Sequence, residues 1–192
     1  MKVIYKELTN IGQKMDLRID VIGSFAYGLW TPYSDIDIAF TNTKSESIII
    51  ERTLLRIFKA IKDQSRALGV KEIYYNTGIP FPNIRLELES YLNCRKLDIT
   101  IFQKKNNGEK YVQFVKEGLT MYPTIRPIFF TFHRILQSFS LHNPARGGVK
   151  TYAIYLMVMW MVSQNSVENI GQILVNLFYY YTYYYNYDEK VN

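Results

Sequence analysis

The fold is decided by residues 23–40, Gly23-Ser24-Phe25-Ala26-Tyr27-Gly28-Leu29-Trp30-Thr31-Pro32-Tyr33-Ser34-Asp35-Ile36-Asp37-Ile38-Ala39-Phe40. Asp35 and Asp37 are separated by one residue, and the side chains of a strand alternate between its two faces. The two acids therefore share one face, while Ile36 and Ile38 face the core. Two carboxylates held side by side favour a hard cation, Mg²⁺ or Mn²⁺, and such ions usually bridge a substrate triphosphate. The segment predicts nucleotide chemistry.

A Gly-Ser pair precedes the two acids. Gly23 and Ser24 stand between an apolar run, residues 19–22, and a short stretch, residues 25–29, that we expect to form a helical turn. Glycine lets the backbone approach a phosphate closely, and the free N–H groups at a helix start favour an anion. No Gly-Lys-Ser/Thr follows, and Gly28 alone makes no dinucleotide fingerprint. We predict a different phosphate-binding loop that uses Gly23 and Ser24.

A third acidic residue, Asp98, lies in another alternating run, residues 95–102. Alternation places this acid on the face opposite to the apolar residues of the run. An isolated Asp-x-Asp is more often found on a solvated strand edge. Burial of the apolar face of both strands in one sheet would, however, bring three acids together. We therefore predict a metal site formed by Asp35, Asp37 and Asp98.

The apolar periodicity predicts an α+β protein with two parts. Alternation predicts five strands, at residues 18–22, 35–41, 70–75, 84–89 and 96–102. Helical spacing predicts helices between and before them, at residues 2–15 and 45–68. After a turn signal at residues 104–108, only helices are predicted, at residues 109–118, 124–139, 149–163 and 167–185. We place a domain boundary between residues 103 and 104.

Composition excludes several classes of protein. The chain has 192 residues and is 48% hydrophobic, which is enough for the core of one domain or of two small ones. Its longest uncharged apolar stretch, residues 152–162, is shorter than the roughly 18 to 20 residues that a membrane span needs, so no membrane partner is expected. The single cysteine, Cys94, excludes an internal disulfide and suits an intracellular location.

Positive charge is concentrated in the middle of the chain. Residues 103–150 contain eight basic and two acidic residues, which accounts for the whole formal net charge of +6. Such a segment beside an acidic metal site would suit a polyanionic substrate, because phosphate neutralisation supplies most of the sequence-independent affinity for nucleic acid. An ordinary solvated lysine-rich surface is an equally good reading of composition alone.

The order of these motifs resembles a known superfamily. Gly-Ser, ten residues, Asp-x-Asp and a later strand Asp form the pattern of the DNA polymerase β-like nucleotidyltransferases. Residues 122–128, Tyr-Pro-Thr-Ile-Arg-Pro-Ile, and 147–154, Gly-Gly-Val-Lys-Thr-Tyr-Ala-Ile, are similar to the noncanonical poly(A) polymerases and terminal uridylyltransferases. Residues 169–181 resemble the last helix of their central domain. The resemblance implies a mixed-sheet nucleotidyltransferase palm domain, residues 1–103, and an all-helical poly(A)-polymerase-associated-type domain, residues 104–192.

The resemblance also implies a reaction. A template-independent RNA 3′-terminal nucleotidyltransferase would add AMP from ATP to an RNA 3′ end. Two Mg²⁺ or Mn²⁺ ions would be held by Asp35, Asp37 and Asp98, and Asp98 is the best candidate for the general base. Thr151 and Tyr152 occupy the places of a phosphate-binding hydroxyl residue and of a tyrosine that stacks on the incoming base. Core packing is an equally good reading of Tyr152 from the sequence alone.

Other positions are also assigned to the nucleotide or to RNA. Two family lysines that contact the triphosphate are replaced here by His133 and Gln137, which are equally well read as solvated helix positions. Basic residues of the charged segment, Lys104, Lys105, Arg146 and Lys150, are expected to bind RNA.

Several alternatives stay open at the level of sequence. A uridylyltransferase would use UTP, but residues 109–115 lack the Asn-Thr pair that uridylyl-transferring relatives often have there. A nucleotidyltransferase that modifies proteins or small molecules would fit the acidic motif but not residues 147–154. Because relatives usually extend past the last helix, the expectation includes a reduced enzyme, one whose nucleotide pocket is completed by a protein partner, or an inactive RNA-binding subunit. Family resemblance slightly favours the nucleus over the cytoplasm.

Overall fold

The computed structural model describes the chain in eight segments, residues 2–31, 34–42, 49–79, 82–89, 96–102, 107–142, 147–164 and 169–184. The chain separates into two compact units, residues 1–114 and 115–192. This division falls within a helix, whereas the predicted domain boundary at residues 103 and 104 lies outside the described residues. The boundary stays a prediction, and each unit is considered by itself.

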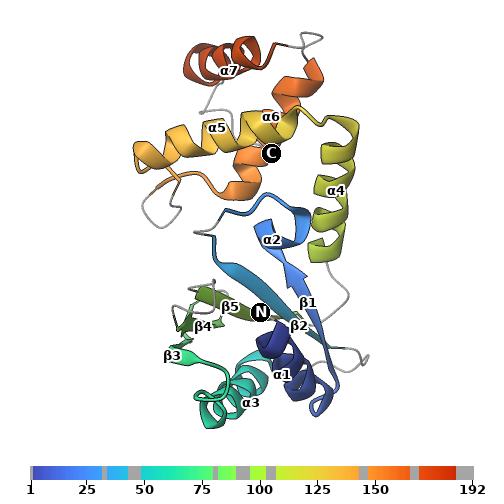
Figure 1. The fold of residues 1–192 in the computed structure, drawn as a ribbon, viewed down its shortest axis with the longest axis vertical. Coiled ribbons are helices and arrows are strands. Elements are labelled where there is room, and N and C mark those ends of the chain that lie inside the picture. The colour runs from blue at the N-terminus through green and yellow to red at the C-terminus, as the bar shows by residue number, and fades with distance from the viewer. Residues whose placement is uncertain are drawn as a thin grey trace. The chain divides into compact units, whose positions relative to one another are not determined.

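The first unit is built on a mixed five-stranded sheet (Figure 1). Its strands stand in the order β1-β2-β5-β4-β3. The central pair β2 and β5 is parallel, and the other neighbours are antiparallel. The strands span Leu17–Ile22 (β1), Ile36–Asn42 (β2), Val70–Asn76 (β3), Asn83–Leu88 (β4) and Lys96–Phe102 (β5). Every bound lies within one residue of its prediction, and the predicted mixed α+β fold is confirmed.

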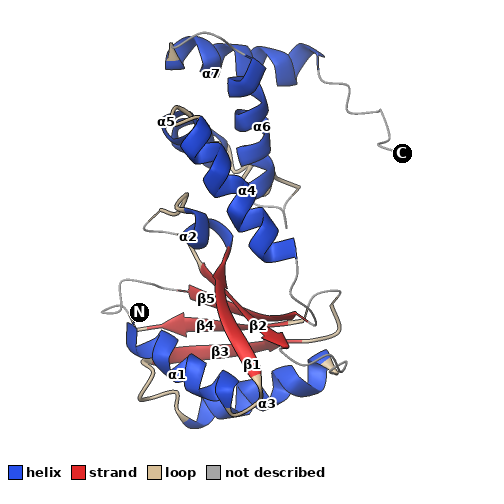
Figure 2. Ribbon diagram, turned by 90° about the vertical axis from the view of Figure 1, so that its right-hand side faces the viewer, coloured by secondary structure: helices blue, strands red, loops and turns tan. Residues whose placement is uncertain are grey.

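Two helices, α1 (Lys2–Gln13) and α3 (Ile50–Asp63), cover one face of this sheet (Figure 2). The helix predicted over residues 45–68 is α3, but the chain leaves it in turns after Asp63. Leu68 is nevertheless buried in the same core, which explains why helical spacing continued in the sequence. The first residues of that prediction, 45–48, lie outside the described residues.

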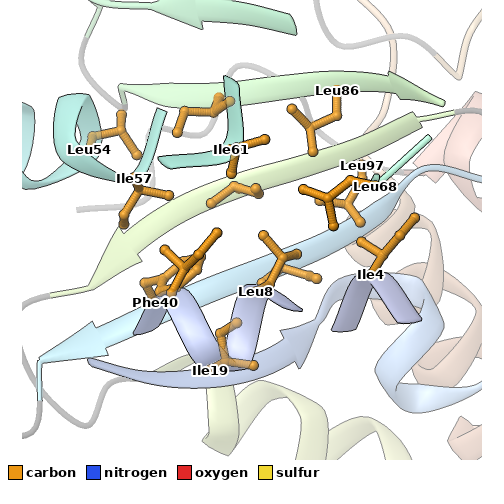
Figure 3. Packing of buried hydrophobic residues seen from close by; sticks show 14 of the residues in the cluster. Ile4, Leu8, Ile19, Phe40, Leu54, Ile57, Ile61, Leu68, Leu86 and Leu97 are labelled. Atoms are coloured by element: carbon orange, nitrogen blue, oxygen red, sulfur yellow. The ribbon is translucent and has the colours of Figure 1, made fainter. Parts of the chain in front are cut away.

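The core lies between the sheet and these two helices, where Leu8, Phe40, Ile57 and Leu86 pack together (Figure 3). Burying one such side chain contributes about 1.5 to 3 kcal/mol. Strands β4 and β5 alternate strictly between fully buried and half-buried residues. Because a slip of one residue would turn the apolar set away from the helices, the core fixes the register of the sheet. That register also fixes which polar side chains meet on the other face.

The second unit is helical. The division between the units falls within α4 (Asn107–Met121), and the second unit continues with α5 (Ile125–Ser138), α6 (Thr151–Gln164) and α7 (Ile170–Tyr179), which runs into a π-helical turn, η3 (Tyr180–Tyr184). Asn169 caps α7, accepting hydrogen bonds from the backbone N–H groups of the second and third helical residues. None of the helices among the described residues has the length and apolar character that a membrane crossing requires.

Helical spacing in residues 124–139 predicts one buried stripe, formed by Ile125, Ile128, Phe129, Phe132, Ile135, Leu136 and Phe139. Five of these residues are buried in α5, Ile135 is half-buried, and the prediction is wrong at Phe139. The five buried residues are Ile125, Ile128, Phe129, Phe132 and Leu136. Phe139, which the spacing placed in the same stripe, is 71% exposed. The reason is that α5 ends at Ser138, so the helical phase no longer applies at the next residue.

Candidate active site

The register of the sheet sets two of the predicted acids directly beside each other. Asp37 on β2 pairs with Asp98 on β5, in the parallel centre of the sheet. Asp35 stands two residues before Asp37, just ahead of β2. All three acids are partly buried. The sheet therefore brings Asp37 and Asp98 side by side on its polar face, with Asp35 just ahead of the strand, and the three-acid metal site stays a prediction.

Gly23 is packed against one of these acids, Asp37. It follows the last residue of β1, Ile22, which is the register partner of Asp37, and it opens the short helix α2 (Gly23–Tyr27). Its φ of +65° belongs to the left-handed region that favours glycine. A Cβ at this position would lie 2.0 Å from Oδ2 of Asp37. The sequence requires glycine here because any side chain would occupy the place of the Asp37 carboxylate.

Burial and the neighbouring carboxylates raise the proton affinity of two of these acids, Asp37 and Asp35. Burial, and then the negative charges of Asp98 and Asp35, raise the pKa of Asp37 to about 7. Burial and Asp98 likewise raise the pKa of Asp35. Partly buried acids that crowd each other favour a bound cation, and hard carboxylate oxygens suit Mg²⁺ or Mn²⁺. The donor set thus fits the predicted ions.

One of the three acids, Asp98, forms an ion pair with a basic residue, Arg85. It lies on β4 as the register partner of Asp98. Its Nε donates to Oδ1 of Asp98 at 2.7 Å and its Nη2 donates to Oδ2 at 2.6 Å. This pair raises the pKa of Arg85 above its ordinary value. Among the described residues, no three acidic, histidine or cysteine side chains are already gathered into a metal-ligand group.

Sequence reasoning missed Arg85. The sequence does contain one indication of this residue. In the strand predicted at residues 84–89, the buried residues Ile84, Leu86 and Leu88 alternate with residues of the polar face, and Arg85 is one of these. Alternation alone could place Arg85 on the same side of the sheet as the acids. It could not show that β4 is the neighbour of β5, which is what brings Arg85 to Asp98.

The two residues that replace the family lysines contact other residues of the second unit. His133 is half-buried, stacks on Phe129 at a ring separation of 5.7 Å, and meets His142 edge-on at 6.2 Å. Burial, and then His142, lower its pKa. Gln137 accepts a hydrogen bond from Nη1 of Arg134 at 2.9 Å.

Thr151 and Tyr152 form the start of α6 and are both half-buried. The ring of Tyr152 stacks on Tyr155, with ring centroids 6.3 Å apart and planes inclined by 26°. Tyr155, one turn further on, is fully buried, and burial raises its pKa to about 12. Tyr155 is thus one of the core residues of α6, whereas Tyr152 is only half-buried.

The basic residues assigned to RNA are mostly beyond what the structure describes. Lys150 is exposed, directly before α6. Lys104, Lys105 and Arg146 lie outside the described residues.

The chain is similar to known proteins in sequence. A family model described as "Nucleotidyltransferase domain" matches residues 2–118. "Poly(A) RNA polymerase protein 1" of Saccharomyces cerevisiae is 23% identical over 183 residues, which are 91% of this chain and 27% of that protein. The chain therefore spans about a quarter of the length of this relative.

Solved structures share the fold. Terminal uridylyl transferase 4 from Trypanosoma brucei with bound GTP matches with a TM-score of 0.76 and 14% identity, over 96% of this chain and 68% of that one. The polymerase core of TRAMP, an RNA surveillance complex, matches with a TM-score of 0.71 and 20% identity, over 97% of this chain and 60% of that one. With a family model that covers well over half of its residues, the chain belongs to the nucleotidyltransferase domain family.

Proposed function

We propose that this protein is a template-independent RNA 3′-terminal nucleotidyltransferase that transfers AMP from ATP. The observation that carries the proposal is the pairing of Asp37 with Asp98 across the parallel strands, with Gly23 packed on the Asp37 carboxylate. The similarity to the yeast poly(A) RNA polymerase supports RNA as the acceptor.

The three carboxylates have the central role in this proposal. Asp35, Asp37 and Asp98 would hold two Mg²⁺ or Mn²⁺ ions, which neutralise the triphosphate and favour the ionised 3′-hydroxyl when bound. Asp98 would accept the proton of that hydroxyl. The attacking oxygen forms a bond to the α-phosphorus in line with the bond to pyrophosphate, which breaks. Positioning and charge neutralisation supply most of the catalysis.

Nucleotide and RNA contacts complete the proposal. Gly23 and Ser24 would bind the triphosphate, and Thr151 and Tyr152 would bind a phosphate and the base. His133 and Gln137 are weaker candidates, because both already contact neighbouring side chains. Lys104, Lys105, Arg146 and Lys150 would bind RNA phosphates, which carry no sequence information. A protein partner that completes the nucleotide pocket is part of the proposal.

The choice between ATP and UTP has a direct test. Labelled RNA with a free 3′-hydroxyl is incubated with Mg²⁺ or Mn²⁺ and each nucleoside triphosphate separately. We expect extension with ATP and none with RNA that ends in a 3′-deoxynucleotide. Extension with UTP instead would establish the uridylyltransferase alternative, which the likeness to the trypanosome enzyme motivates. If the protein binds RNA but extends it with no triphosphate, the alternative of an inactive RNA-binding subunit would be supported.

We expect Tyr152→Ala to raise the KM for the triphosphate far more than it lowers the melting temperature, and Tyr152→Phe to be nearly neutral. Stacking on a base is worth about 1 to 3 kcal/mol. Truncation of a core aromatic residue costs about 3 to 5 kcal/mol of folding free energy. Tyr152 is half-buried, so its ring has an accessible part that a base could cover.

Thermal melts beside nucleotide titrations on the same variants measure both effects. Tyr155→Ala is the matched control from the next turn of α6, because Tyr155 is fully buried and its loss should act on stability. If Tyr152→Ala strongly lowers the melting temperature while nucleotide affinity is unchanged in the folded fraction, Tyr152 has a role in core packing and not in base stacking.

A further inference from the structure

We propose that Arg85 is a positioning residue that holds Asp98 in the metal-free protein and yields at least one of its oxygens when a divalent cation binds. The inference rests on the proposed function, because it concerns the same carboxylates. It adds a residue that the acidic motif does not contain, and it gives that residue a role before the reaction begins.

The geometry of the ion pair supports this role. The two hydrogen bonds from Arg85, at 2.7 and 2.6 Å, take both oxygens of Asp98. A guanidinium fork that matches both oxygens fixes the orientation of a carboxylate, which a single ammonium charge does not. Asp98 therefore lies between a cation on β4 and a carboxylate, Asp37, on β2.

The exposure of the pair makes an exchange feasible. The side chain of Arg85 is 40% exposed and that of Asp98 is 21% exposed. Water can therefore solvate the Arg85 guanidinium when it separates from Asp98. Because a partly exposed ion pair is weak, breaking it should lower the association constant for the metal ion by at most about a factor of five. An ion that contacts several of these carboxylates at once would compete effectively. Arg85 meanwhile reduces the repulsion between Asp98 and Asp37 in the absence of that ion.

The sheet offers a matched ion pair for comparison. Arg18 and Asp20 on β1 are 42% and 25% exposed, close to the values for Arg85 and Asp98. Nε of Arg18 donates to Oδ2 of Asp20 at 3.0 Å, and the same oxygen accepts a hydrogen bond from Oγ1 of Thr41 at 3.2 Å. The register partner of Asp20 is Ala39 rather than an acid. Loss of Arg18 should therefore leave the affinity for a divalent cation unchanged.

Mn²⁺ binding without nucleotide or RNA tests the inference apart from activity. Free Mn²⁺ is measured by electron paramagnetic resonance during titration of the wild type, Arg85→Met, Arg85→Lys and Arg18→Met. We expect Arg85→Met to bind Mn²⁺ more tightly, by up to about five-fold, because the competing cation is gone. Arg85→Lys should show a smaller change, since one ammonium group cannot take both oxygens as the fork does. Circular dichroism checks that each variant is folded.

The outcomes separate the inference from the function on which it rests. Mn²⁺ affinity in Arg85→Met that equals or falls below the wild-type value overturns the exchange and leaves the proposed metal site intact. An equal gain in Arg18→Met would mean that only the overall charge matters, and also overturns it. If neither the wild type nor Arg85→Met binds Mn²⁺, both the inference and the metal-dependent function fail. If Arg85→Met does not fold, Arg85→Lys decides the question by the same comparison.

Discussion

Replacement of Asp37 by asparagine is expected to abolish nucleotide addition and to leave the metal-free protein at least as stable as the wild type. In the proposed mechanism the carboxylate at this position supplies charge that the reaction requires, whereas asparagine keeps the size of the side chain and removes its negative charge. Burial and the neighbouring acids make that charge unfavourable before any cation binds. Primer extension with ATP and denaturant unfolding in a chelator measure the two quantities.

The stability gain of Asp37→Asn should depend on pH. The pKa of Asp37 is about 7 in the folded protein and about 3.9 in an unfolded chain. Between these values the folded state binds more protons, so the free energy of unfolding of the wild type falls as pH rises from about 4 to 7. The asparagine variant has no carboxylate at position 37, so its free energy of unfolding should not show this fall. Its advantage should be small near pH 4 and should reach on the order of 2 to 4 kcal/mol above pH 7.

A second acid on the same face provides the control for both measurements. Asp20→Asn on β1 breaks the contact with Arg18 but leaves Asp35, Asp37 and Asp98 in place. It should therefore retain nucleotide addition, and it should be no more stable than the wild type, because it removes an ion pair and relieves no crowding of carboxylates. Wild-type turnover by Asp37→Asn, or turnover by the wild type in excess chelator, would refute the metal assignment.

Local patterns were enough to place the strands and the faces of their residues. Alternation in residues 96–102 put Asp98 opposite to the apolar set, and the register with β2 confirms that face. Pairing between distant strands is not encoded in alternation, because any two strands with one apolar face can lie side by side in a sheet. The contact of Arg85 with Asp98 therefore emerged only from the strand order.

The same limit applies to Gly23 and to the helix ends. The sequence indicated that a glycine at position 23 lets the backbone approach a phosphate, but its contact with Asp37 depends on the pairing of β1 with β2. The exposure of Phe139 depends on where α5 ends, and helix ends are weakly marked in a sequence without a glycine or proline stop signal. These misses concern distant pairings and ends rather than the elements themselves.

Gly23→Ala is expected to destabilise the protein and to reduce nucleotide addition by about 100-fold or more. The added Cβ would lie 2.0 Å from Oδ2 of Asp37, so the carboxylate or the backbone must move. A displacement of about 1 Å in a reacting group is enough for a loss of that size. The left-handed backbone adds a cost of about 1 to 2 kcal/mol, and the overcrowding adds about 1 to 3 kcal/mol.

Two comparisons separate the collision from the backbone strain. Gly78 has a similar φ of +71° with open space around its Cβ position, so Gly78→Ala should show the backbone cost alone and keep its activity. The double variant Gly23→Ala/Asp37→Ala removes the carboxylate that the new methyl group meets. In that background the stability cost of Gly23→Ala should shrink towards the cost of Gly78→Ala, with a small remainder because Cβ of residue 37 still lies 3.2 Å from the new Cβ, while activity stays lost. If Gly23→Ala lost as much stability in the double variant as in the wild-type background, glycine would be required at position 23 for its backbone conformation and not to make room for the Asp37 carboxylate.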